Sequence, residues 1–294
     1  MTTVDLKGKN VLITGPTSGI GRGTALALAK AGAKLILVAR NPRKCERVTQ
    51  EIVDAGGEAP ISIIADLSLL SEVERAADEF LATGLPLHIL MNNAGLINQR
   101  RTITSEGLEQ TMAVNHFAPV ALTLRLLPSL KRAPGARILN ITSSSYAIAR
   151  LNLDDLTFKR FYWPMGPYSA SKLSNIYFTR ELARRLEGSD ITVNAVHPGL
   201  IFTNLGIGNN PGLTQKVLGS IWSKFSLDES EGHRCRVYAA TAPELEGVTG
   251  EYIADCRVAR LKPIALKEAP AKRLWEVSET TTGVRFPADN GTGT

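Results

Sequence analysis

Up to about residue 200, short apolar runs alternate with longer amphipathic stretches. The apolar runs cover residues 10–14, 34–39, 61–65, 87–91, 136–141 and 192–196, and they consist mostly of β-branched residues and leucine. Runs of this continuity are typical of strands buried on both faces, as in a parallel sheet. The stretches between them repeat apolar residues at three- and four-residue steps, which indicates helices. The alternation predicts an α/β fold with a doubly wound, central parallel sheet of about seven strands and helices on both faces.

The last third of the chain follows a different pattern. Residues 199–227 are glycine-rich at first and then amphipathic, which indicates a flap rather than part of the sheet. Helices are expected at about 230–241 and 271–278, with a short strand at 251–254 between them. No linker divides the chain, so we predict one domain over residues 1–286 and a disordered tail at 287–294.

Composition and charge exclude several classes of protein. Of the 294 residues, 44% are hydrophobic and 21% are charged, as in a globular chain that can bury a core without disulfides or metals. The formal net charge is +6, but the 34 lysines and arginines are scattered rather than gathered in a basic run. Nucleic-acid binding is therefore not expected. The modest excess of positive charge fits better with a cavity that binds an anionic ligand.

Cysteine usage and hydropathy predict the compartment. The three cysteines form no Cys-x-x-Cys pair, which argues against a disulfide framework or a zinc site and favours a reducing compartment. No signal peptide opens the sequence and no apolar stretch of about 18 residues occurs, so a membrane span is not expected. The four histidines lack metal-ligand spacing, and we expect them to be structural, with no bound metal. These features predict a cytoplasmic protein.

A glycine-rich turn, Thr14-Gly-Pro-Thr-Ser-Gly-Ile-Gly21, joins the first predicted strand to the first predicted helix. Gly15 allows a tight turn, Gly19 lets the backbone approach a pyrophosphate, and Gly21 lets the helix pack closely on the strand. The start of the helix supplies unpaired N–H groups and the positive end of its dipole. A turn in this strand–helix context predicts dinucleotide binding.

Tyr168 and Lys172 are the candidate acid–base pair. They are four residues apart in a helical segment, so they share one face of the helix. A lysine ammonium close to a phenol favours the phenolate and lowers its pKa from the usual value of about 10. Such a phenol can donate or accept a proton near neutral pH.

Further motifs point to one family. Asn92-Asn-Ala-Gly95 ends the fourth predicted strand, Asn115 lies in the helix that follows, Ser143 lies just beyond the fifth strand, and Pro198-Gly199 follows the sixth. Together with the glycine-rich turn and the tyrosine–lysine pair, these motifs resemble the short-chain dehydrogenase/reductase family over nearly the whole chain. The chain is most similar to the retinol-dehydrogenase-like branch of that family. The resemblance implies a single Rossmann-type domain.

The resemblance also implies roles in interconverting a carbonyl and an alcohol. Tyr168 would act as general acid or base, and Lys172 would also bind the nicotinamide ribose. Ser143 would orient the substrate oxygen, and Asn115 would hold a water that connects Lys172 to solvent. The hydride would pass to or from the nicotinamide. The cofactor would contact Gly15, Ser18, Gly19, Ile20, Gly21, Arg22, Arg40, Asp66, Leu67, Asn93, Ala94, Gly95, Tyr168, Lys172, Pro198, Gly199 and Thr203.

The end of the second predicted strand distinguishes the two nicotinamide dinucleotides. A preference for NAD would place Asp or Glu there, to bind the adenosine ribose hydroxyls. The sequence instead has Arg40, whose planar guanidinium suits a 2′-phosphate. Arg22, with Arg43 or Lys44, could assist. We therefore expect NADP(H), although Ser18 stands where many NADP-using relatives carry a basic residue.

Aromatic residues gather between Ser143 and Tyr168, although only 6% of the chain is aromatic. They either pack under a loop or form one wall of an apolar pocket, with the flap at 199–227 opposite. Such a pocket would take an apolar or aromatic ketone, aldehyde or alcohol. The residues that we assign to it are Ser144, Tyr146, Tyr162, Trp163, Phe202 and Trp222. Ser144 is alternatively a structural hydroxyl.

Two other functions stay open on the same fold, namely reduction of a C=C bond or a quinone, and non-catalytic sensing of NADP. The sensor is disfavoured because both the tyrosine and the lysine are present. We also expect a homodimer or homotetramer, because the helix that carries Tyr168 is apolar on more than one face. The apolar residues are Leu173, Ile176, Tyr177, Phe178 and Leu182.

Overall fold

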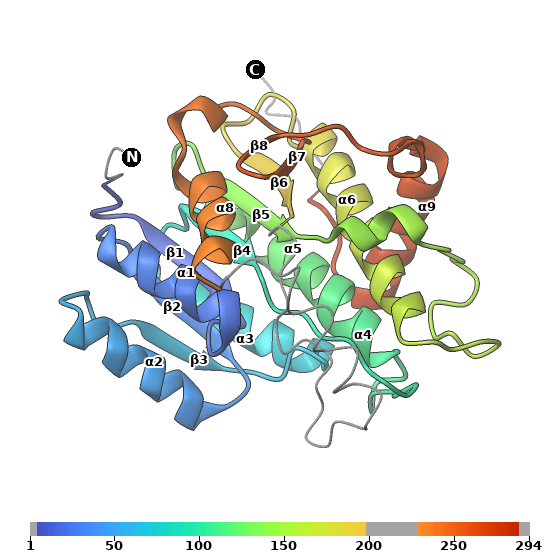
Figure 1. Cartoon of the computed structure of the whole chain (residues 1–294), viewed down its shortest axis with the longest axis horizontal. Helices are drawn as coiled ribbons and strands as arrows, with labels where there is room; N and C mark the ends of the chain where they lie inside the picture. Colours follow the sequence, from blue (N-terminus) through green and yellow to red (C-terminus); the bar gives the residue numbers. More distant parts are fainter. Residues whose placement is uncertain (1–4, 198–228, 288–294) are drawn as a thin grey trace.

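The computed structural model describes residues 5–197 and 229–287, and its strands form one eight-stranded sheet (Figure 1). The order across the sheet is β3-β2-β1-β4-β5-β6-β7-β8. All neighbouring strands are parallel except β7 and β8. The expected doubly wound fold is confirmed. The strands are β1 (Asn10–Thr14), β2 (Lys34–Ala39), β3 (Ile61–Ile64), β4 (Ile89–Asn92), β5 (Arg137–Ile141), β6 (Thr192–Val196), β7 (Tyr252–Ala254) and β8 (Arg257–Val258).

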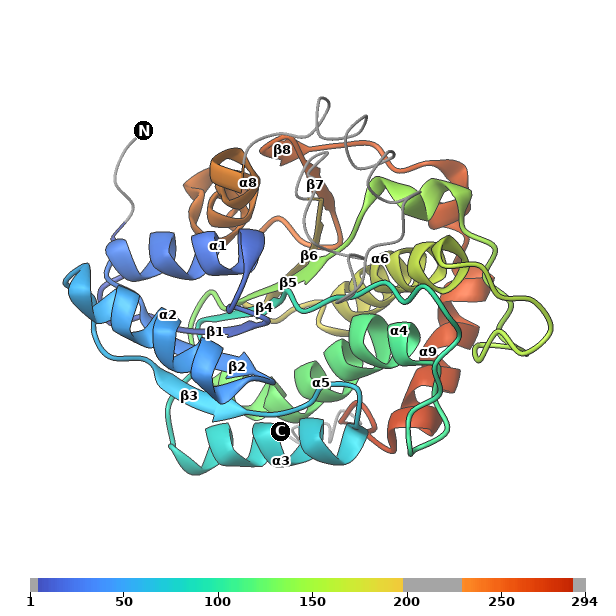
Figure 2. The ribbon, with the colours of Figure 1, turned by 60° about the horizontal axis from the view of Figure 1, so that its bottom comes forward.

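Helices cover both faces of the sheet (Figure 2). On one face lie α1, α2 and α8, and on the other lie α3, α5 and α6. The last helix, α9, packs against α5 and α6. The α-helices are α1 (Gly19–Lys30), α2 (Pro42–Asp54), α3 (Leu70–Ala82), α4 (Gln110–Met112), α5 (Ala118–Lys131), α6 (Met165–Arg185), α8 (Glu229–Thr241) and α9 (Glu268–Thr282). A π-helical turn (Ala113–Phe117) joins α4 to α5, and short 3-10 helices occur at Ser144–Ile148, Pro243–Leu245 and Pro263–Leu266.

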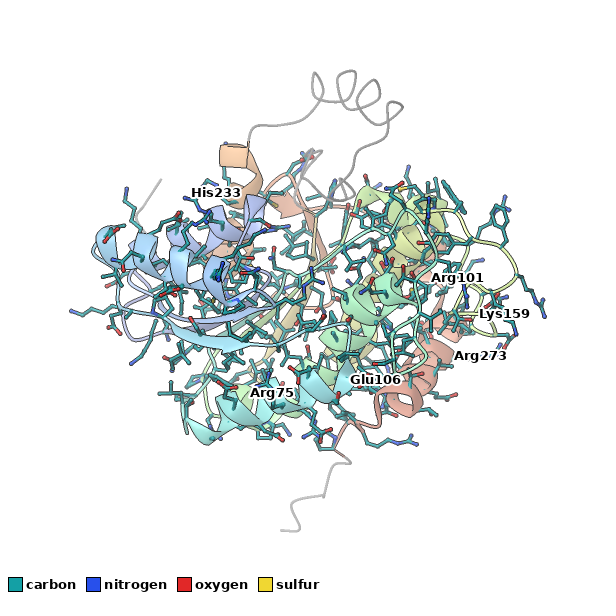
Figure 3. All side chains as sticks on the ribbon, turned by 90° about the horizontal axis from the view of Figure 1, so that it is seen from below. Arg75, Arg101, Glu106, Lys159, His233 and Arg273 are labelled. Carbon is teal, nitrogen blue, oxygen red and sulfur yellow. The ribbon has the colours of Figure 1, made fainter. Side chains whose placement is uncertain are left out.

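The α3 helix receives its N-terminal cap from a distant loop. Leu69, at the N-cap position, has no side-chain oxygen to offer. Glu106, labelled in Figure 3, instead accepts hydrogen bonds from the N–H groups of Leu70 (2.5 Å) and Ser71 (3.1 Å). A carboxylate at this end also interacts favourably with the helix dipole. The contact holds the loop that follows β4 against α3.

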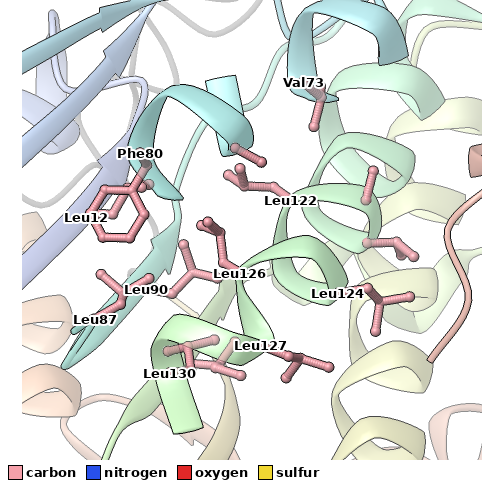
Figure 4. Close-up of a cluster of buried hydrophobic side chains, with 14 of the residues drawn as sticks. Leu12, Val73, Phe80, Leu87, Leu90, Leu122, Leu124, Leu126, Leu127 and Leu130 are labelled. Atoms are coloured by element: carbon pink, nitrogen blue, oxygen red, sulfur yellow. The ribbon is translucent and has the colours of Figure 1, made fainter. Parts of the chain in front are cut away.

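Strand side chains alternate between two apolar cores, one on each face of the sheet. Leu12 and Leu90 belong to the core under α3, α5 and α6, which Figure 4 shows together with Phe80. Val11 and Leu35 belong to the core under α1, α2 and α8. Because both faces are buried, the strands read as continuous apolar runs rather than as an alternation of apolar and polar residues.

The outer side of α6 is enclosed by α9. The indole of Trp275 stacks on Phe178, with 5.6 Å between ring centroids, and the Arg185 guanidinium lies 4.3 Å from the centroid of the indole. The apolar α6 residues that we expected to face a second subunit are buried within the chain itself. Self-association therefore stays a prediction, and these α6 residues no longer support it.

Several expectations differ from the structure or lie outside it. Strand β8 was not expected, because two residues are too few to show a periodicity, and it follows a turn in which Asp255 and Cys256 have φ of 50° and 53°. The flap at 199–227 and residues 288–294 of the tail lie outside the described residues. The domain extent of 1–286 stays a prediction. Within the described ranges, no helix has the length and apolarity to cross a bilayer.

Candidate active site

The glycine-rich turn and the end of β4 meet where the strand order reverses, between β1 and β4. In open α/β sheets, ligands bind at this position. Gly15 has φ of 65°, and a Cβ there would lie 2.9 Å from Ala94 Cα. A Cβ on Gly21 would lie 2.3 Å from the Gly15 carbonyl oxygen and 2.7 Å from Asn93 Nδ2. Both positions require glycine, because any side chain would collide with backbone or with the neighbouring motif.

Hydrogen bonds join the same two segments. Thr14 Oγ1 accepts from the backbone N–H groups of Asn93 (3.0 Å) and Ala94 (2.9 Å). In return, Asn93 Nδ2 donates to the carbonyl oxygens of Thr14 (2.6 Å) and Gly15 (3.0 Å). The Asn93 amide group, which we expected beside the cofactor, thus also holds the shape of the turn.

The N-terminus of α1 presents its N–H groups without a side-chain cap. Ser18 occupies the N-cap position, but its side chain makes no capping hydrogen bond, and the first turn holds no acidic residue. The first N–H groups of a helix have no partner within the helix. Together with the helix dipole, they form a cradle that fits the pyrophosphate of a dinucleotide, with Ser18, Gly19 and Ile20 at its rim.

Lys172 is buried at the carboxyl end of β5. Its Nζ donates a hydrogen bond to the Ile141 carbonyl oxygen (3.1 Å), and Asn175 Nδ2 donates to the same oxygen (3.2 Å). A Cβ added to Gly95 would lie 3.5 Å from both Lys172 Nζ and Asn115 Oδ1. The structure therefore brings Gly95, Asn115 and Lys172 together, although they come from three separate segments.

Asn115 lies in the π-helical turn between α4 and α5. Its Oδ1 accepts from the Leu96 N–H (2.8 Å), and its Nδ2 donates to the Leu96 carbonyl oxygen (2.9 Å) and to Ser171 Oγ (3.1 Å). Single π-helical turns inside helices occur frequently at functional sites. Here the turn holds Asn115 against both the loop after β4 and the helix that carries Lys172.

The Tyr168 ring lies between two other catalytic candidates in the sequence, Ser143 and Lys172, and interacts with both. Lys172 Nζ lies 5.5 Å from the centroid of its ring, and the Ser143 side chain is close enough to the phenol to lower its pKa. Ser143 is the N-cap of the 3-10 helix at Ser144–Ile148, two residues after β5. The four catalytic candidates thus lie together at the carboxyl ends of the strands. They are Ser143, Tyr168, Lys172 and Asn115.

The pKa of Tyr168 contradicts our expectation. Burial raises it above the usual value, and this effect exceeds the opposing effects of the Ser143 side chain and of the positive charge on Arg236. Burial also lowers the pKa of Lys172 to about 7, so its ammonium is only partly charged near neutral pH. In the protein alone, the phenol therefore stays protonated.

Arg236 in α8 is a residue of this site that the motifs did not reveal. Its side chain is buried, with 5% exposed, and its charge acts on both Tyr168 and Lys172. Burial lowers the pKa of Arg236 to about 10. Cys235 and Ala239 are buried on the same helix. An arginine among apolar helix positions could have drawn attention to this site, because charged residues are rarely buried without a partner.

The residues expected at the adenosine end lie at the carboxyl ends of β2 and β3. Arg40 is exposed, and its Nη1 lies 4.0 Å from Asp66 Oδ2. Leu67, beside Asp66, is buried. Arg22 forms an ion pair with Glu51 of α2, with 2.7 Å between Nε and Oε2. Arg40 is thus better placed than Arg22 to bind a 2′-phosphate.

The residues expected to line a substrate pocket separate in the structure. Tyr146 is buried in a core cluster, packs edge-on against Tyr252, and accepts a hydrogen bond from the Lys262 N–H (3.0 Å). Its burial and packing support the structural alternative for this residue. Ser144 is exposed, directly beside Ser143.

Other pocket candidates lie in the loop before α6 or outside the described residues. Tyr162 donates a hydrogen bond to the Asn98 carbonyl oxygen (2.8 Å), and Trp163 is 43% exposed. The remaining expected residues, Pro198, Gly199, Phe202, Thr203 and Trp222, lie outside the described ranges.

A large open groove lies elsewhere, along the amino-terminal ends of the strands. Its volume is about 1160 Å³, and it is lined by residues such as Lys9, Arg137, Arg180 and Thr192. It contains none of the predicted site residues. The chemistry-bearing side chains converge on the opposite edge of the sheet, so the groove is not the candidate active site.

Known proteins share both this sequence and this fold. The family model for short chain dehydrogenases matches residues 9–213. Retinol dehydrogenase 14 of Mus musculus is 38% identical over 95% of this chain and 87% of its own, and retinol dehydrogenase 12 of Homo sapiens is 37% identical over 97% and 90%. The crystal structure of an uncharacterized protein from Mycobacterium paratuberculosis has a TM-score of 0.78, with 30% identity over 97% of both chains.

The chain belongs to the short-chain dehydrogenase family, which confirms the resemblance drawn from its motifs. The family uses nicotinamide dinucleotides, and the cradle at α1 fits such a group. The chain is accordingly an oxidoreductase that interconverts alcohol and carbonyl groups.

Proposed function

We propose that this chain is an NADP(H)-dependent oxidoreductase that interconverts a carbonyl and an alcohol on an apolar or aromatic small molecule. One observation carries the proposal, namely that Ser143, Asn115 and the α6 pair Tyr168 and Lys172 converge from three segments at the carboxyl ends of the strands, beside the glycine-rich turn. A helix start without a side-chain cap supports dinucleotide binding at the same edge.

In this mechanism Tyr168 exchanges the proton and Ser143 orients the substrate oxygen. The start of α1 and Lys172 would hold a nicotinamide dinucleotide, which would supply or accept the hydride at the substrate carbon. In reduction, the carbonyl oxygen takes the Tyr168 proton, and solvent restores that proton through Lys172 and Asn115. Because burial raises the pKa of Tyr168, the phenol is protonated at neutral pH, which is the form that reduction requires.

Arg40 supports NADP(H) as the preferred dinucleotide. It directly follows β2, where an NAD-binding chain would place a carboxylate, and it is exposed at the carboxyl ends of the strands, where the cofactor would lie. The aromatic loop before α6, with Tyr162 and Trp163, supports an apolar substrate. Cytoplasmic localisation stays a prediction.

Substitution of Tyr168 by Phe tests the mechanism. We expect Y168F to lower kcat for a panel of ketones and aldehydes by roughly 100-fold or more, the size of a lost general acid. NADPH affinity should change little, and it is measured separately by fluorescence titration. Y177F is the matched control, because the Tyr177 hydroxyl lies on the same helix and donates to the Ile264 carbonyl oxygen.

Three outcomes would contradict this proposal. Unchanged ketone turnover in Y168F would remove Tyr168 from the reaction. Turnover of enones or quinones but of no ketone would favour the alternative reductase. NADPH binding without turnover of any compound in the panel would favour a sensor.

A further inference from the structure

The Nε atom of the buried Arg236 guanidinium has no hydrogen-bond partner among the described residues. Arg236 lies in α8, which packs against α1 and against β5, β6 and β7. Figure 3 labels His233, one turn earlier, at the place where α8 faces α1. Only 5% of Arg236 is exposed, and within the described residues its Nε has no hydrogen-bond partner and no carboxylate forms an ion pair with it. A buried charge without a partner is costly, so such a residue indicates a ligand that is bound during function.

The groups around Arg236 belong to the acid–base end of the site. Its charge acts on Tyr168, Lys172 and His197. His197 follows β6, stacks on Tyr252 and has a buried Nδ1 that also lacks a hydrogen-bond partner in the described chain. The charge of Arg236 thus acts both on the catalytic phenol and on His197, and each of these two basic side chains has one buried atom without a hydrogen-bond partner. Among the described residues, the carboxylate of Asp255 is the one whose negative charge acts on His197, and none is found to act on Arg236.

Two anions could satisfy Arg236, namely the diphosphate of the cofactor or a carboxylate of the substrate. The start of α1 already offers backbone N–H groups to a diphosphate. Arg236 instead acts on the groups beside the reacting carbonyl. A guanidinium binds a carboxylate through two parallel hydrogen bonds, which favours the substrate as the source of the anion.

We propose that Arg236, with His197 beside it, forms a carboxylate subsite next to Tyr168, so that the substrates are oxo acids and hydroxy acids with an apolar or aromatic body. This substrate class rests on the proposed function. The subsite places the carboxylate of the substrate on α8 while Ser143 and Tyr168 hold its carbonyl or hydroxyl oxygen. The carboxylate takes no part in the hydride or proton transfer.

Binding of benzoate and of its neutral analogue benzamide tests the subsite without turnover. Both are titrated by calorimetry into the full chain loaded with NADP⁺. In the wild type we expect benzoate to bind at least tenfold more tightly than benzamide. R236Q should weaken benzoate binding at least tenfold and leave benzamide unchanged, whereas R236K, which keeps the charge but not the planar fork, should lie between. R234Q, two residues away on the exposed side of α8, should match the wild type.

Further measurements separate the alternatives. Equal affinity for benzoate and benzamide in the wild type, or no loss in R236Q, would overturn the subsite. A tenfold loss of NADP⁺ affinity in R236Q with benzoate binding intact would assign Arg236 to the cofactor and overturn it as well. If R236Q fails to fold, a loss of benzoate binding in folded R236K still supports the subsite, and wild-type binding in R236K overturns it. Benzoate binding that depends on Arg236 while Y168F keeps full turnover would leave the subsite standing and refute the proposed mechanism.

Discussion

Arg40 and Asp66 face each other across the ends of β2 and β3, with 4.0 Å between Nη1 and Oδ2. Two exposed side chains at this distance are weakly bound to each other, so Arg40 can turn toward a ligand at small cost. A 2′-phosphate offers it a doubly charged, multidentate partner. In the proposed function, the preference for NADP(H) over NAD(H) therefore depends largely on this one side chain.

Exchange of Arg40 for Ala should reveal that preference. We expect the wild type to bind NADPH at least tenfold more tightly than NADH, and R40A to lose most of the difference because the phosphate loses its guanidinium. Fluorescence titration with each dinucleotide measures it, and R47A, an exposed arginine of α2, serves as the control. Equal affinities in the wild type would contradict NADP(H) as the preferred cofactor.

His116 should make folding stability depend on pH. The imidazole is fully buried between Ser278 and Asn175, and burial lowers its pKa to about 4 in the folded chain. The unfolded chain binds this proton at about pH 6.5, so the contribution of His116 is present above that pH and is lost as the pH falls toward 4. The loss should reach about 3 kcal/mol by pH 4.

Urea unfolding at several pH values between 7.5 and 4 measures this effect. H116Q, which cannot titrate, should lose stability less steeply over that range than the wild type. Parallel pH profiles for the two proteins would show that the destabilisation at low pH originates elsewhere.

Among the elements, those built on a repeated pattern could be predicted and those built on a single contact could not. The apolar runs predict β1, β2 and β6 to the residue, because a strand buried on both faces is apolar throughout. The π-helical turn at Asn115 leaves no periodic trace, and β8 is too short to have one. The convergence of Asn115, Gly95 and Lys172 depends on sheet order, which no local pattern encodes.

The final helix, α9, holds α6 in place through Trp275. The indole stacks on Phe178 and lies under the Arg185 guanidinium, and only 4% of it is exposed. We expect W275A to lower the free energy of unfolding by about 3–5 kcal/mol, and W275F, which keeps a stacked ring, by about half as much. Urea denaturation measures both, and equal losses for the two variants would show that the stacking contributes nothing.

For the whole molecule, the enclosure of α6 by α9 affects assembly. The residues expected to face a second subunit, among them Leu173, Ile176 and Leu182, are covered within one chain. The predicted homodimer or homotetramer would therefore have to form through other residues, and a single species of 31.7 kDa in sedimentation at micromolar concentration would contradict that prediction. A species of twice that mass would show that subunits associate through another surface.

The hydrogen bonds between Thr14 and Asn93 connect positions 79 residues apart. During synthesis, the glycine-rich turn leaves the ribosome long before Asn93 and Ala94 are available to support it. A nascent chain therefore cannot hold a dinucleotide until β4 has been made. Helix α6, which carries Tyr168 and Lys172, reaches its final packing later still. Its residue Phe178 stacks on Trp275, which lies near the midpoint of α9 and is synthesised almost last. The order of translation thus builds the cofactor half of the site first and its acid–base half last.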